Sequence, residues 1–173
     1  MSCATVYVAL GSNLGDSAAH VHRALTELDS INDCQLTARS PLYRSAPMGP
    51  IRQGWYVNAA AELQVALDPR ELMTRLQALE QAHGRDRGGT RWGPRTLDLD
   101  ILLFSDLVID EPDLTIPHPG LTRRNFVVYP LLSIAPDLVL PDGRRLDEVA
   151  SGLNLEGLEK MEDREGLSGD PLS

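Results

Sequence analysis

The most regular pattern in the chain is an alternation of side chains over residues 55–65. Apolar residues occupy the odd positions, and Tyr56, Asn58 and mostly polar neighbours occupy the even ones. A period of two is typical of a β-strand that packs one face on a core, so Tyr56 and Asn58 should share the other face. Further strands are predicted by apolar and β-branched runs at 5–10, 35–44 (interrupted by Pro41), 96–104, 107–109, 113–116 and 137–140.

Two other segments repeat apolar residues every three or four positions, which is the period of an amphipathic helix. One helix is predicted over residues 17–29. The second begins at Asp68-Pro69, an N-cap followed by a proline in the first turn, and ends near Gly84. Residues 127–135 are predicted to form a helix or an irregular part of the core. Strands and helices therefore occur in a mixed order along one chain.

The composition indicates one soluble domain with small partners. The 173 residues, 42% of them hydrophobic, suffice for a single core. A formal net charge of -9 argues against binding to nucleic acid or to an anionic membrane surface, and no segment approaches the roughly 20 apolar residues of a membrane span. Cys3 and Cys34 have neither metal-ligand spacing nor a disulfide framework. We therefore expect a cytoplasmic monomer that acts on small molecules.

The C-terminal segment, residues 151–173, differs from the rest of the chain. Acidic residues outnumber basic ones there, and large apolar residues are few. A segment that buries little apolar surface does not offset the entropy lost on ordering. We expect a domain of residues 1–150 followed by an acidic tail, residues 151–173, that is frayed or disordered.

Two aspartates interrupt the apolar strand predicted at 96–104. Asp98 and Asp100 are two positions apart, so they share a face and their Cα atoms lie about 6 to 7 Å apart. That spacing suits Mg²⁺, which takes one or two protein carboxylates and completes its octahedron with water and substrate phosphates. The alternative is that both aspartates belong to the solvated face of an amphipathic strand.

Positive charge is concentrated just before this strand, in a glycine-rich loop predicted at 83–95. The loop carries Arg85, Arg87, Arg91 and Arg95. A guanidinium group presents a fixed fork of donors that matches phosphate oxygens, so the metal ligands and arginines together predict a polyphosphate site. A second loop at 45–54, rich in proline and glycine, is a candidate lid over the same site.

Several further side chains have two interpretations. His118 is a phosphate donor or a capping histidine, and Arg124 is a phosphate contact or a surface residue. Tyr56 and Phe126 sandwich a flat ring or belong to the core. The chain has no Walker A motif and no dinucleotide-binding glycine motif. The residues predict a Mg²⁺-dependent phosphoryl-type transferase, with a metal-dependent phosphodiesterase or a noncatalytic ligand-sensing domain as alternatives, and they do not select a general base.

Several motifs resemble, in order, those of the 6-hydroxymethyl-7,8-dihydropterin pyrophosphokinase family. The most specific is RWGPRTLDLDIL at 91–102, and the others are ALGSNLGD at 9–16, YRSAPMGP at 43–50, YVNAA at 56–60, LEQAHGR at 79–85, IPHP at 116–119 and RNFVVYPLLSIAPDLVLPDG at 124–143. The resemblance spans about residues 6–143. It implies a single α+β domain with a ferredoxin-like, largely antiparallel sheet flanked by helices. It also implies the transfer of pyrophosphate from ATP to the pterin alcohol with release of AMP, a step of folate biosynthesis.

The resemblance implies a role for each matching position. Asp98 and Asp100 would bind two Mg²⁺ ions and would form the catalytic set with Arg85 and Arg95. ATP would be held by Gln77, Glu80, Arg85, Arg87, Trp92, Arg95, Ile101, Leu114, Thr115, His118 and Arg124, and the pterin by Ser45, Ala46, Met48, Tyr56, Asn58, Trp92, Asp98 and Phe126. The chain departs from the family pattern at Gly88-Gly89, where a basic residue is common, and at Asp113, where an arginine can occur.

Overall fold

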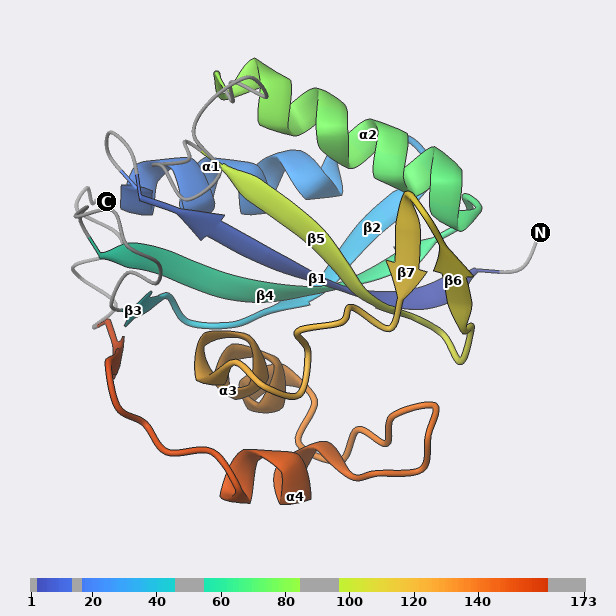
Figure 1. The fold of residues 1–173 in the computed structure, drawn as a ribbon. Coiled ribbons are helices and arrows are strands. Elements are labelled where there is room, and N and C mark those ends of the chain that lie inside the picture. Colours follow the sequence, from blue (N-terminus) through green and yellow to red (C-terminus); the bar gives the residue numbers. More distant parts are fainter. Residues whose placement is uncertain (1–2, 14–16, 46–54, 85–96, 162–173) are drawn as a thin grey trace.

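Six strands form one antiparallel sheet, in the order β5–β1–β4–β3–β8 with β2 also pairing with β4 (Figure 1). The computed structural model describes residues 3–13, 17–45, 55–84 and 97–161. The strands are β1 (Ala4–Ser12), β2 (Cys34–Arg39), β3 (Tyr43–Ser45), β4 (Tyr56–Val65), β5 (Asp98–Phe104) and β8 (Leu158–Lys160). A separate two-stranded sheet is formed by β6 (Ile109–Glu111) and β7 (Leu114–Ile116).

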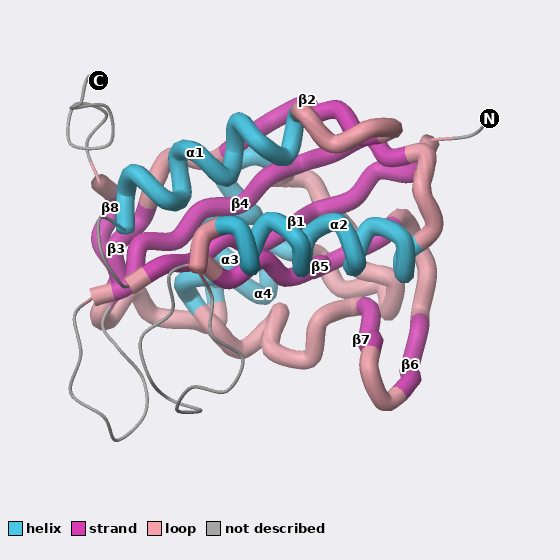
Figure 2. Tube along the Cα trace, turned by 90° about the horizontal axis from the view of Figure 1, so that it is seen from above, coloured by secondary structure: helices cyan, strands magenta, loops and turns pink. Residues whose placement is uncertain are grey.

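Helices cover both faces of the large sheet, as Figures 1 and 2 show. On one face lie α1 (Ser17–Asp29) and α2 (Pro69–Ala82), and on the other lie α3 (Asn125–Ile134) and α4 (Leu146–Ser151). Buried apolar side chains form two clusters, one between the sheet and the first helix pair and one between the sheet and the second. The sheet therefore separates two cores.

The order of elements explains the fold class. β1–α1–β2 and β4–α2–β5 are crossover units, and β1 lies between β4 and β5 in the sheet. Two such units with both helices on one face make the ferredoxin-like arrangement. The predicted α+β class, an antiparallel sheet flanked by helices, is confirmed.

The alternation read from the sequence sets the two faces of β4 and β5. The odd residues of β4 belong to the core under α1 and α2, and they are Val57, Ala59, Ala61, Leu63 and Val65. In β5, Leu99 and Ile101 belong to the same core, whereas Asp98 and Asp100 lie on the opposite face. The predicted facing of both strands is confirmed.

The start of α2 is also as predicted. The carboxylate of Asp68 accepts a hydrogen bond from the N–H of Glu71 at 2.8 Å, and the carboxylate of Glu71 accepts one from the N–H of Asp68 at 3.0 Å. This capping box satisfies backbone donors that the first turn leaves unpaired, and Pro69 loses nothing there because it has no N–H.

The expectation of a frayed or disordered tail from residue 151 is wrong as far as residue 161. β8 pairs antiparallel with β3, and Leu158 is only 8% exposed. The N–H of Met161 donates to the carbonyl of Leu42 at 2.9 Å. Composition did not predict this docked strand, because a short strand needs few apolar side chains to pair with an open sheet edge. Residues 162–173 lie outside the described residues.

Smaller differences occur at strand ends. β1 continues through Gly11 to Ser12, beyond the predicted end at residue 10. Pro41 divides the predicted strand 35–44 into β2 and β3. The strand predicted at 137–140 is reduced to one bridge between Val139 and Arg145, because the pairing of this segment stops after that single pair of residues.

Two further predictions concern the long loops and membrane-spanning segments. Most of the loops predicted at 45–54 and 83–95 lies outside the described residues. In the part of the chain that the structure describes, no helix is both long enough and apolar enough to cross a membrane.

Candidate functional site

A pocket of about 210 Å³ opens on the sheet face that carries α3, where β1 ends and β4 and β5 begin. We call it the sheet pocket. It is lined by Ala9, Leu10, Gly11, Ser45, Tyr56, Asn58, Asp98, Asp100, Leu102, His118, Arg124, Phe126 and Val127. Two aromatic side chains, an amide and two carboxylates thus surround one small cavity, a combination that suits a flat polar ring.

A second pocket, of about 410 Å³, lies between α2, the edge strand β5 and β7. We call it the helix pocket. It is lined by Met73, Leu76, Gln77, Glu80, Leu99, Asp100, Ile101, Pro112, Asp113, Leu114, Thr115, His118 and Pro119. Its size and its mixture of apolar walls and polar groups suit a larger ligand than the sheet pocket does.

The two pockets share Asp100 and His118. They meet there because β5 is the edge of the sheet, so its first residues border one pocket on the sheet face and the other beyond the edge. Asp98 lines the sheet pocket and is half-buried, whereas Asp100 is exposed. A ligand in each pocket would therefore place its nearest end beside Asp100 and His118.

Asn58 is held in one orientation at the floor of the sheet pocket. Its Nδ2 donates to the hydroxyl of Ser45 at 2.7 Å, and both residues are buried. Gly11 pairs with Asn58 on one side and with Asp98 on the other, and a Cβ at Gly11 would lie 3.4 Å from Asn58 Oδ1. Sequence reasoning missed Gly11, although a glycine inside a strand often marks such a close approach.

His118 is held as a hydrogen-bond donor between the pockets. Its Nδ1 accepts a hydrogen bond from the N–H of Gly120 at 3.0 Å, so the proton of the neutral ring belongs on Nε2. The pKa of His118 is lowered, because burial and the charge of Arg124 together outweigh the opposite effect of Asp100. The ring is therefore neutral near pH 7 and keeps one N–H for a ligand.

Arg124 lies beside the same loop. Its guanidinium is 5.9 Å from the centre of the Phe126 ring, within the range of a cation–π contact. A Cβ at Gly120 would come within 2.8 Å of Arg124 Nε. Gly120 thus leaves room for Arg124 and supplies the donor for His118.

Glu80 is a buried acid on the last turns of α2, only 3% exposed. Its Oε2 accepts a hydrogen bond at 2.8 Å from the N–H of Leu99, the residue between Asp98 and Asp100. Among the described strands, none pairs with β5 on that side, and Glu80 instead accepts the hydrogen of this backbone donor.

The structure brings together every predicted site residue that it describes, since each of them lines one or both pockets. The predicted residues that lie outside the described residues are Ala46, Met48, Arg85, Arg87, Trp92 and Arg95. The lining residues that sequence reasoning missed, apart from Gly11, are chiefly apolar, such as Leu102, Val127, Met73 and Leu76. Their sequence signal is that of ordinary core residues, so no pattern could have singled them out.

Asp98 and Asp100 fit Mg²⁺ better than a metal bound by protein ligands alone. Within residues 3–13, 17–45, 55–84 and 97–161, no group of three or more His, Cys, Asp and Glu side chains is gathered for a metal ion. Structural zinc sites use four protein ligands, whereas Mg²⁺ keeps several waters and substrate oxygens beside one or two carboxylates. Two carboxylates on one face, open to two pockets, match the second pattern.

Asp113, on the wall of the helix pocket, is paired with Arg70 at the start of α2. The Arg70 guanidinium donates to both oxygens of Asp113 at 2.8 and 2.9 Å, and it also contacts Glu111. These hydrogen bonds lower the pKa of the Asp113 carboxyl, so Asp113 is ionised near pH 7. The helix pocket therefore has a negative charge at a position where the family pattern can have a positive one.

Fold and site together define a class: an α+β protein whose two pockets meet at Asp100, on an edge strand, and at His118. The family model described as 7,8-dihydro-6-hydroxymethylpterin-pyrophosphokinase matches residues 7–136. The chain belongs to this family.

Relatives and solved structures support the assignment. A Pseudomonas aeruginosa protein named 2-amino-4-hydroxy-6-hydroxymethyldihydropteridine pyrophosphokinase is 48% identical over 156 residues, covering 90% of this chain and 96% of that protein. The protein of the same name from Haemophilus influenzae is 44% identical over 145 residues, covering 84% and 90%. The crystal structure of wild-type Plasmodium falciparum HPPK-DHPS matches 87% of this chain with a TM-score of 0.66 at 12% identity. This chain spans 41% of that longer one, and the match supports the fold alone.

Proposed function

We propose that the chain transfers the pyrophosphoryl group of ATP to 6-hydroxymethyl-7,8-dihydropterin, giving the pterin diphosphate and AMP. The hydroxymethyl oxygen forms a bond to the β-phosphorus and loses its proton. The bond between the β-phosphorus and the oxygen that bridges it to the α-phosphorus breaks, and AMP leaves with that oxygen. The observation that carries the proposal is the pair of pockets that meet at Asp100 and His118 in a chain of this family.

The sheet pocket is the proposed pterin site. Tyr56 and Phe126 would hold the two faces of the ring, and Asn58 would hydrogen-bond its edge. Asn58 Nδ2 donates one of its two hydrogens to Ser45, so the amide oxygen and the second N–H remain to hydrogen-bond the pterin. Backbone groups near Ser45, Ala46 and Met48 and the indole of Trp92 complete the proposed contacts.

The helix pocket is the proposed ATP site. Ile101, Leu114 and Thr115 would contact the adenine, with Gln77 and Glu80 along the nucleotide. His118 Nε2–H and Arg124 would donate to the triphosphate, joined by Arg85, Arg87 and Arg95 from the segment before β5. Asp98 and Asp100 would hold two Mg²⁺ ions, which neutralise phosphate charge and align the reacting groups when bound. The residues of the chain mainly position the reactants and exclude water.

The proposed location follows from the substrates. ATP and the pterin are small cytoplasmic molecules, so we place the protein in the cytoplasm, acting as a monomer without nucleic acid or membrane partners. Sedimentation at micromolar concentration tests the monomer directly, and a concentration-dependent dimer would contradict it.

Product analysis tests the proposed reaction. The protein is incubated with 6-hydroxymethyl-7,8-dihydropterin, ATP and Mg²⁺, and the nucleotides are separated by ion-exchange chromatography. AMP should appear in step with the pterin diphosphate, and neither should form without pterin or Mg²⁺. Stoichiometric ADP would refute pyrophosphoryl transfer, and AMP formed without pterin would indicate a hydrolase.

Ser45→Ala should weaken pterin binding. The substitution removes the acceptor of Asn58 Nδ2 and lets the amide turn away, so KM for the pterin should rise about five- to tenfold with little change in kcat. Steady-state kinetics at saturating ATP measures both constants. The control is Thr37→Ala on the exposed strand β2, which removes a hydroxyl that donates a hydrogen bond to Glu62. An unchanged KM for the pterin would contradict the role of Ser45.

Asp113→Asn should strengthen ATP binding. It removes one exposed negative charge from the wall of the helix pocket, and solvent screening limits the gain to about a twofold fall in KM for ATP. The matched control is Glu111→Gln, which also loses an Arg70 contact but lies outside the pocket lining. Equal effects of the two variants would locate the cause in Arg70 and not in the pocket charge.

A further inference from the structure

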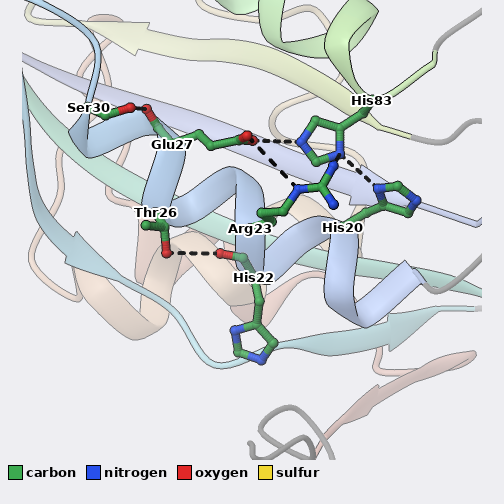
Figure 3. Close-up of polar contacts among 7 residues, drawn as sticks. All are labelled: His20, His22, Arg23, Thr26, Glu27, Ser30 and His83. Carbon is green, nitrogen blue, oxygen red and sulfur yellow. Dashed lines mark hydrogen bonds and ion pairs between the residues drawn. The ribbon is translucent and has the colours of Figure 1, made fainter.

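His83 is a fully buried polar side chain at the C-terminus of α2, and the proposed mechanism does not use it. Its Nε2 lies 2.6 Å from Glu27 Oε1, and its Nδ1 lies 2.8 Å from His20 Nδ1. Arg23 Nη2 is 3.4 Å from the same Nδ1. As Figure 3 shows, the three partners come from one side of α1 and converge on the single histidine. We call His20, Arg23, Glu27 and His83 the histidine clamp.

The histidine clamp joins α1 to the last turn of α2, and that turn also contacts the catalytic strand. Glu80, one turn before His83, accepts the N–H of Leu99 between Asp98 and Asp100. His83 itself is the C-cap, with its N–H directed at the carbonyls of Leu79 and Glu80. A shift of this turn would therefore move Glu80 and release the backbone that spaces the two aspartates.

The hydrogen bonds of the clamp define the roles of the two ring nitrogens of His83. The Glu27 carboxylate only accepts, so His83 Nε2 carries a hydrogen. The Arg23 guanidinium only donates, so His83 Nδ1 presents its lone pair to Arg23 and to His20.

We infer that His83, held by His20 and Glu27, is a positioning residue that fixes the last turn of α2 and, through Glu80, the geometry of Asp98 and Asp100. The kinetic part of its test rests on the proposed function. The hydrogen-exchange part does not, because the protection of the Leu99 amide from exchange is measured on the free protein.

The substitutions His83→Ala, His83→Gln and His20→Gln separate positioning from simple stability. In His83→Ala, the Leu99 amide should exchange about tenfold faster relative to the Ala61 amide of the central strand β4, because Glu80 loses its support. Turnover should fall about tenfold or more with a smaller change in KM for ATP, since displaced catalytic groups lower kcat. His83→Gln should restore both values in large part, because its amide can donate to Glu27 and accept from His20. Thr26→Ala, on an exposed part of α1, is the control.

His20→Gln should keep Leu99 exchange close to the wild-type rate, because a glutamine amide can also donate to His83 Nδ1.

The remaining outcomes are equally decisive. If His83→Ala lowers the melting temperature but leaves Leu99 exchange and kcat unchanged, the clamp is only structural and the inference is wrong. If His83→Ala does not fold, His83→Gln and His20→Gln still decide through the exchange rate of the Leu99 amide. If the wild-type protein makes no pterin diphosphate, the proposed function fails, and the exchange data still support or overturn the clamp.

Discussion

Asp98→Asn and Asp100→Asn should each lower kcat by about a thousandfold or more. Each variant replaces a charged oxygen ligand by a neutral amide of the same shape, which weakens Mg²⁺ binding and leaves phosphate charge without compensation. The loss corresponds to about 4 kcal/mol of transition-state stabilisation. The two side chains share the face of β5 between the pockets, so neither can replace the other. Initial rates across a Mg²⁺ series measure the effect.

The fold should survive these substitutions. The two carboxylates repel each other in the metal-free protein, so a neutral amide should leave the free energy of unfolding unchanged or raise it slightly. The matched control is Asp106→Asn, an exposed aspartate just after the end of β5, which should keep wild-type activity. Near-normal turnover of either site variant at ordinary Mg²⁺ concentrations would remove the aspartates from the mechanism.

Deletion of residues 152–173 should destabilise the protein by about 3 to 5 kcal/mol, since it removes the burial of Leu158 and several hydrogen bonds. The lost contacts include the pairing of β8 with β3 and the donation from Tyr129 to the carbonyl of Leu153 at 2.9 Å. For a chain of this size the melting temperature should fall by roughly 10 °C. Pterin affinity should fall as well, because Ser45 pairs with Leu158.

Deletion of residues 162–173 is the matched control, because it leaves the described contacts of β8 in place. Thermal unfolding of both truncated proteins beside the full chain separates the docked strand from the rest of the acidic segment. If the longer deletion unfolds at the same temperature as the full chain, the strand β8 contributes nothing to stability. Leu158→Ala offers a point test of the same contact and should cost about 2 kcal/mol or more.

Local patterns along the chain predicted much of the secondary structure and placed the candidate residues on it. Alternation over 55–65 gave the two faces of β4, and the spacing of Asp98 and Asp100 put both on one face of β5, because a strand has a period of two. Asp68-Pro69 located the start of α2 through its capping chemistry. The order of the motifs identified the family. The structural inferences succeed because each depends on neighbours within a few residues, whereas the family resemblance depends on motifs spread over about residues 6–143.

Contacts between residues far apart in the chain are known only from the folded molecule. The sheet order brings Gly11 between Asn58 and Asp98, and the edge position of β5 makes Asp100 and His118 common to two pockets. The docking of β8 and the contact of His83 with α1 likewise join segments far apart in the chain. No local pattern encodes such contacts, because strand order and helix packing are chosen by the burial and hydrogen bonding of the whole molecule.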